Sequence, residues 1–226
     1  AKNINVICGE NSTGKTTLLK VLYSVLKPLS KGSKTAVNKE MEEQLFVSKL
    51  QGVFRPDEMK IGRLVKRKQG SSRTDFEVLL DKNQKISIGF GNRQENHADI
   101  KVEVCRTSAK YDAIYIPTKE MISTTEHFSS LYEEYHIDFE EVYYDLAKLL
   151  DRPLSKGPNT NEQNEVLKSF EEIMKGQIVQ RDKKFYLKIR GEGEFEMGLL
   201  SDGYRKLAMI VYLILSGSMN KNTILF

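Results

Sequence analysis

The spacing of hydrophobic residues changes several times along the chain, and each spacing predicts a different kind of element. Near the N-terminus, the apolar run Ile4-Asn5-Val6-Ile7-Cys8 predicts a short buried strand. From Thr17 to Leu26 the apolar residues recur with helical spacing, and we expect this helix to end before Pro28. A strand, a loop and a helix therefore form a first unit over residues 1–27.

Apolar and polar residues alternate in several stretches of the chain that follow Gly52. This alternation is typical of strands, and polar turns separate the stretches that show it, which are residues 61–67, 74–80, 85–90 and 100–104. The pattern predicts an antiparallel meander of about four strands, inserted over residues 52–105. A helix around residues 39–50 is expected before it.

The second half of the chain is predicted to be mainly helical. A short buried strand at 113–116 precedes residues 119–175, whose spacing predicts helices interrupted by a loop near the prolines at 153–158. Residues 177–226 then combine strands, a helix near 203–215 and the start of a last strand. Strands that alternate with helices predict an α/β fold, which we interpret as one domain over residues 1–226 with the meander and the helical lobe as insertions.

The loop between the first strand and the first helix carries a phosphate-binding motif. Residues Gly9-Glu10-Asn11-Ser12-Thr13-Gly14-Lys15-Thr16 match the P-loop pattern G-x-x-x-x-G-K-[ST]. The two glycines allow backbone N–H groups to point at a phosphate, and the helix N-terminus adds its positive dipole end. We therefore expect this chain to bind a nucleoside triphosphate with Mg²⁺; the alternative is a chance match in a glycine turn.

A second anion-binding geometry is predicted at the start of the last helix, where Leu200-Ser201-Asp202-Gly203-Tyr204 precedes an apolar run. This stretch, named the signature turn below, resembles the L-S-G-G-Q signature of ABC-type ATPases, in the variant form of SMC-like, RecF-like and OLD-like heads. Asp202 replaces the usual glycine, which leaves the closeness of the backbone approach open. The alternative is a serine that only caps the helix, with an aspartate in its first turn.

The resemblance to ABC-type ATPases implies that ATP and Mg²⁺ are bound between subunits. It implies phosphate or Mg²⁺ contacts from Gly9, Asn11, Ser12, Thr13, Gly14, Lys15, Thr16 and Thr17. Lys15 would reach the β- and γ-phosphates, and Thr16 would ligate Mg²⁺. Ser201 and Gly203 would act in trans on the nucleotide of a neighbouring subunit, so that at least a homodimer is required.

The same resemblance implies a loop that senses the γ-phosphate and a Walker B strand. Glu120, which follows the strand at 113–116, is the candidate for a catalytic contact in that loop, and Gln51 is the second candidate. The alternative for both is an ordinary surface residue. Residues 222–226 resemble the start of Walker B, and we expect its acidic pair beyond Phe226.

The helical lobe is short and lacks sustained heptads, unlike the coiled coil of an SMC protein. The chain therefore resembles most closely the compact ATPases of bacterial antiphage systems, of the Septu, PARIS and OLD-like type. That resemblance implies an ATP-hydrolysing sensor or switch that partners a separate effector, a nuclease or a toxin. The alternative is a DNA-repair ATPase of RecF or SMC type that binds duplex DNA.

Composition narrows these interpretations only slightly. The 226 residues are 39% hydrophobic, and no apolar run reaches the roughly 18 residues of a membrane span, so no membrane contact is expected. The net charge of +4 permits contact with nucleic acid without requiring it. Five basic residues on one predicted hairpin could contact DNA phosphates or protect a strand edge: Arg63, Lys66, Arg67, Lys68 and Arg73. Cys8 and Cys105 lie in apolar stretches and predict reduced core residues of a cytoplasmic protein.

Overall fold

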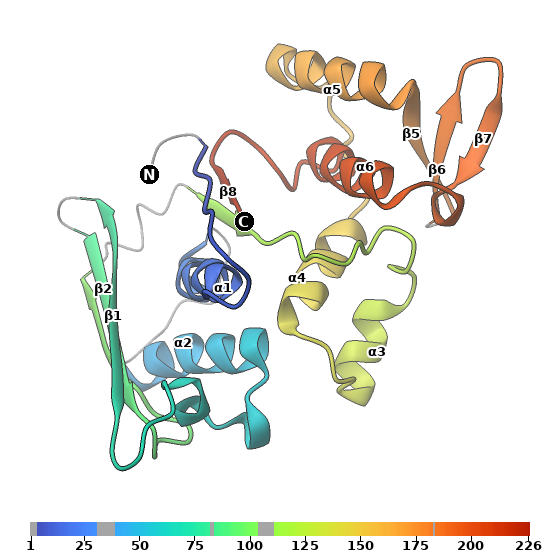
Figure 1. The fold of residues 1–226 in the computed structure, drawn as a ribbon. Coiled ribbons are helices and arrows are strands. Elements are labelled where there is room, and N and C mark those ends of the chain that lie inside the picture. Colours follow the sequence, from blue (N-terminus) through green and yellow to red (C-terminus); the bar gives the residue numbers. More distant parts are fainter. Residues whose placement is uncertain (1–3, 31–38, 82–83, 104–110, 183) are drawn as a thin grey trace. The chain divides into compact units, whose positions relative to one another are not determined.

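A computed structural model describes residues 4–30, 39–81, 84–103, 111–182 and 184–226 of the chain (Figure 1). These residues form helices and small sheets, so the predicted mixture of helices and strands is confirmed. The chain divides into two compact units, Ala1–Ala113 together with Phe226, and Ile114–Leu225. Each unit is described by itself below.

Two packed helices form one side of the first unit. Helix α1 (Lys15–Leu26) packs against α2 (Lys39–Phe54), and Phe46 and Leu50 of α2 are fully buried. Both helices were predicted, and α2 extends beyond its expected end. A short 3₁₀ helix, η1 (Lys27–Leu29), follows α1 directly. It contains Pro28, which has no backbone N–H to continue the α-helix.

The sheet of the first unit contains three antiparallel strands in the order β1-β2-β3. Their bounds are β1 (Arg73–Asp81), β2 (Gln84–Gly91) and β3 (Asp99–Glu103). The side chains of Ile86, Ile88 and Phe90 are buried, as expected for alternate positions of a strand that covers a core on one face. Three of the four predicted strands are therefore confirmed.

The fourth predicted strand, residues 61–67, is wrong. The chain there begins with a short 3₁₀ helix, η3 (Ile61–Leu64), which follows another, η2 (Asp57–Met59). The buried residues Ile61 and Val65 are four positions apart, so one face of a turn, rather than one face of a strand, points into the core. A Cβ on Gly62 would lie 2.7 Å from two backbone oxygens of the loop before β3, which explains the tight turn at this glycine.

The buried strand predicted for residues 4–8 is also not present. The described part of this segment has no regular structure, and Ile4 and Val6 are 85% and 80% exposed. An apolar run becomes a buried strand only where neighbouring strands complete its hydrogen bonds, and no described strand pairs with it. Cys8 is exposed, so its predicted place in the core is wrong; Cys105 lies outside the described residues.

The second unit contains the predicted helical lobe, with a break where the prolines occur. Its helices are α3 (Phe128–Tyr135), α4 (Glu141–Leu150), α5 (Asn161–Met174) and α6 (Asp202–Leu215). Strands β5 (Gly176–Arg181), β6 (Lys184–Ile189) and β7 (Gly193–Glu196) form an antiparallel sheet, which η5 (Met197–Leu199) connects to α6. The predicted strands at 113–116 and from Thr223 correspond to β4 (Asp112–Ile114) and β8 (Thr223–Leu225).

Helix α6 is the centre of the hydrophobic core in the second unit. Its side chains from Ala208 to Ile214 are largely buried, and it packs against α4, α5 and β5 (Figure 1). The ring of Tyr212 contacts that of Phe185 edge to face, with centroids 4.6 Å apart. Its hydroxyl lies 2.6 Å from the backbone oxygen of Arg152 and 3.0 Å from Oε1 of Gln180, so it can donate to either acceptor.

Substitution of Tyr212 by phenylalanine should lower the free energy of unfolding by about 0.5–1.5 kcal/mol, because it removes the donor of a part-buried hydrogen bond. Burial also raises the pKa of Tyr212, so the hydroxyl stays protonated in the folded state. Urea unfolding at neutral pH measures the loss, with Tyr135→Phe as the control because Tyr135 is 70% exposed. Equal midpoints for the two variants would contradict the assigned hydrogen bond.

Candidate functional site

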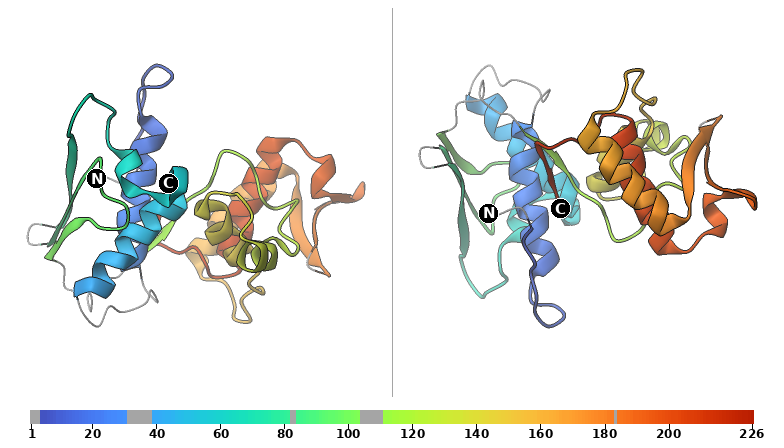
Figure 2. Two further views of the ribbon diagram at one scale, coloured as in Figure 1. Left: turned by 90° about the horizontal axis from the view of Figure 1, so that it is seen from below. Right: turned by 90° about the horizontal axis from the view of Figure 1, so that it is seen from above.

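The P-loop (Gly9–Thr16) is an open loop that ends at the first turn of α1 (Figure 2). Gly14 occupies the N-cap position with φ 90°, a conformation that other residues adopt only with strain. The first N–H groups of any α-helix have no intrahelical partner, and here no capping side chain accepts from them either. The sequence therefore places an uncapped helix N-terminus directly after the glycine-containing loop.

The side chain of Lys15 folds back over this loop. Its Nζ donates hydrogen bonds to the backbone oxygens of Gly9, at 2.8 Å, and of Glu10, at 2.5 Å. The hydroxyl of Thr13 donates to the same Glu10 oxygen at 2.9 Å, which closes the loop into a turn. A Cβ on Gly9 would lie 3.1 Å from the Thr13 hydroxyl, so a larger residue would crowd this turn.

These groups fit an anionic phosphate chain. The uncapped N–H groups of α1 and the Lys15 ammonium are hydrogen-bond donors within one short segment, and the hydroxyl of Thr16 lies on the same exposed first turn. The other residues that the sequence assigned to phosphate are exposed around it: Asn11, Ser12, Thr13 and Thr17. A hydroxyl beside a bound phosphate suits Mg²⁺, which keeps several waters and takes few protein ligands.

The signature turn lies at the start of α6, in the second unit. Ser201 is the N-cap, and its hydroxyl accepts a hydrogen bond from the Tyr204 N–H at 3.5 Å, which is the cap that the alternative interpretation expects. Ser201 and Gly203 are both exposed, and a Cβ on Gly203 would meet no atom within 4 Å. The two helix N-termini that the sequence singled out are thus both open in their own units.

Glu120 and Gln51, the two candidates for a γ-phosphate sensor, are both buried, so neither is an ordinary surface residue. The Gln51 amide donates to Oδ1 of Asn96 at 2.8 Å and to the backbone oxygen of Met59, and thereby fixes the loops around η2. The Glu120 carboxylate accepts hydrogen bonds from the N–H and the hydroxyl of Ser123. It also forms an ion pair with Arg205 of α6 at 3.3 Å.

Arg205 is a residue that reasoning from the sequence missed. It comes directly after the signature turn, but nothing in the sequence indicates that its partner is Glu120, 85 positions earlier, since 205 − 120 = 85. Within the second unit, the structure brings Glu120 to the signature helix.

The predicted basic hairpin is not a single cluster, because residues 61–67 do not form a strand. Arg63 forms an ion pair with Asp57 at 2.6 Å, and Arg73 forms ion pairs with Asp75 and Asp99. The exposed basic run that remains is Lys66, Arg67 and Lys68.

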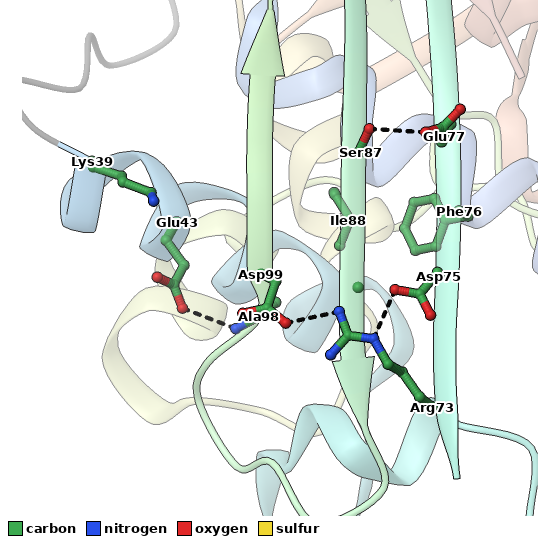
Figure 3. A pocket seen from close by; sticks show the side chains of 11 residues that line it. Lys39, Glu43, Arg73, Asp75, Phe76, Glu77, Ser87, Ile88, Ala98 and Asp99 are labelled. Atoms are coloured by element: carbon green, nitrogen blue, oxygen red, sulfur yellow. Dashed lines mark hydrogen bonds and ion pairs between the residues drawn. The ribbon is translucent and has the colours of Figure 1, made fainter.

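A pocket of about 640 Å³ in the first unit is lined by residues of the sheet and of the start of α2 (Figure 3). Arg73 crosses this sheet to Asp75 and Asp99, and its guanidinium fits because Gly89 beneath it has no side chain. Four carboxylates and two cationic side chains line the pocket: Glu43, Asp75, Glu77, Asp99, Lys39 and Arg73. This excess of negative charge disfavours a nucleotide, so the pocket does not compete with the P-loop as a phosphate site.

No protein-family model matches the sequence, and no curated protein matches it either. Among the described residues, no helix is long and apolar enough to cross a lipid bilayer. In the same part of the chain, no group of three or more His, Cys, Asp or Glu side chains is arranged to hold a metal ion. The arguments that follow therefore rest on the two helix N-termini.

Substitution of Gly14 by alanine should lower the free energy of unfolding by about 1–2 kcal/mol, because an L-residue is strained at this φ. The control is Gly157→Ala, since a Cβ there meets no atom within 4 Å and its φ is not positive. Urea unfolding of both variants measures the difference. If Gly14→Ala is as stable as the control, the P-loop does not adopt this conformation in solution.

Proposed function

We propose that this protein binds Mg²⁺·ATP at the P-loop and hydrolyses it as an ABC-type ATPase. The observation that carries the proposal is the first turn of α1, which is exposed and uncapped and follows Gly14 at φ 90°. Phosphate oxygens are suitable acceptors for its free N–H groups, and Lys15 is already positioned over the same loop. Thr16 would ligate Mg²⁺, which neutralises phosphate charge when it is bound.

In this proposal Ser201 and Gly203 complete the site of a second subunit. Both lie on the exposed N-terminus of α6, which presents donors and a positive dipole end to an anion. A nucleotide held between the P-loop of one subunit and the signature turn of another requires at least a homodimer. The ABC-type fold of the whole chain is part of the same proposal.

For the biological role, we favour a sensor or switch subunit that controls a separate nuclease or toxin in antiphage defence. This part rests on the resemblance to compact ATPases of that kind. The competing function is a DNA-repair ATPase that binds duplex DNA, and its support is the exposed run Lys66, Arg67 and Lys68. Arg63 and Arg73 do not add to that run, because both are already in ion pairs with aspartates. Stimulation of the ATPase by duplex DNA would favour the competing function.

Substitution of Lys15 by alanine should weaken ATP binding roughly 10- to 100-fold, because one charge-assisted hydrogen bond contributes about 1.5–3 kcal/mol. Titration with a fluorescent ATP analogue, with Mg²⁺ and with EDTA, measures the affinity. The control is Lys168→Ala, which removes the same charge from an exposed position on α5. Equal affinities for both variants would refute the phosphate assignment of the P-loop.

Substitution of Gly203 by alanine separates function from stability. The added methyl group meets nothing within 4 Å in a single chain, and alanine in place of glycine stabilises a helix by roughly 0.5–1 kcal/mol. We therefore expect a higher melting temperature together with weaker nucleotide-dependent self-association, because the methyl group obstructs the approach of the N–H group to a phosphate.

Sedimentation velocity with a non-hydrolysable ATP analogue and Mg²⁺ measures this association. Gly198→Ala is the matched control, since its Cβ also meets no atom within 4 Å and it lies just before the signature turn. If Gly203→Ala associates as strongly as this control, the signature turn does not contact nucleotide in trans.

A further inference from the structure

The ion pair between Glu120 and Arg205 joins an irregular loop to the first part of α6. Its side chains are 7% and 24% exposed, whereas those of the Asp202–Lys206 pair, on the first turns of the same helix, are 55% and 37% exposed. Nη1 of Arg205 lies 3.3 Å from Oε1 of Glu120. The backbone N–H and the hydroxyl of Ser123 donate to the two carboxylate oxygens of Glu120, so each oxygen has a hydrogen-bond donor.

Arg205 is one helical turn after Ser201, and its N–H donates to the Ser201 backbone oxygen at 3.1 Å. The backbones of residues 201 and 205 are therefore joined directly across the first turn of α6. One turn later, Sδ of Met209 accepts a hydrogen bond from the Met121 N–H at 3.3 Å. Through these two contacts, the loop that carries Glu120 and Met121 is attached to two successive turns of α6. Both turns follow the signature turn in the sequence.

We propose that Glu120 and Arg205 are positioning residues, whose ion pair holds the signature turn in the orientation that binds nucleotide in trans. This role rests on the proposed function. The pair fixes the first turns of α6 against the loop, so the Ser201 hydroxyl and the Gly203 N–H keep one direction toward the neighbouring subunit. Nε of Arg205 is buried without a hydrogen-bond partner among the described residues, so Glu120 is the described anchor of this guanidinium.

The test measures two properties of the full chain for each variant: affinity for the fluorescent ATP analogue, and nucleotide-dependent self-association. Glu120→Gln and Arg205→Met should keep the affinity within twofold, because the P-loop is untouched, and should weaken the association at least tenfold. Arg205→Lys keeps the positive charge. Its loss of association should therefore be smaller than that of Arg205→Met, but still threefold or more. A purely structural role would not separate the two measurements in this way.

Two controls match these variants. Lys206→Met removes a cation from the exposed pair near the same turn, and Tyr212→Phe destabilises the same helix away from the signature turn. The nucleotide-dependent self-association of both control variants should stay within twofold of that of the wild type. If either control loses association as strongly as Glu120→Gln, the effect is general to α6 and the positioning role is overturned.

The outcomes distinguish this inference from the proposed function. If the wild type binds nucleotide and associates, and the folded variants Glu120→Gln and Arg205→Lys each lose less than threefold of this association, only the positioning role is overturned. If the wild type neither binds Mg²⁺·ATP nor associates with it, the proposed function fails and the positioning role fails with it. If Arg205→Met does not fold, the result for Arg205→Lys is decisive. A threefold or greater loss of association supports the positioning role, and a smaller loss overturns it.

Discussion

The backbone N–H groups at the start of α1 are the constraint on which the candidate site depends. A helix leaves its first N–H groups without internal partners, and Gly14 has no side chain that could accept from them. These groups must therefore bond to water or to a ligand. A phosphate brings several acceptors and negative charge to the same place, so it satisfies both the hydrogen bonds and the helix dipole.

Both helices of the proposed site are stabilised at one end and open at the other. In α1 the buried residues are confined to Tyr23–Leu26, and in α6 they begin only at Ala208. Burial of the C-terminal turns stabilises each helix, while the N-terminal turns stay in contact with solvent. This division allows an exposed N-terminus without loss of the helix, because helical stability comes mainly from tertiary packing.

The sequence predicted the elements whose pattern is local, and missed contacts between residues far apart. Helical spacing predicted α1 and α6, and alternation predicted β1 and β2, since each pattern reflects one buried face. Residues 4–8 were predicted as a strand from apolar character alone, although a strand also needs neighbours. Buried Gln51 donates a hydrogen bond to Asn96, 45 positions later, and no local pattern indicates this contact.

The partly buried pair of Glu120 and Arg205 is better understood as a determinant of geometry than of stability. The cost of removing two charges from water largely offsets their attraction, so such a pair contributes little net stability compared with apolar side chains of similar size. Arg205 also has a buried Nε without a partner among the described residues, which adds a further cost. A pair of this kind does, however, restrict its two segments to one arrangement, because any other leaves a charge buried and alone. At the start of α6, that restriction acts on the turn that carries Ser201 and Gly203.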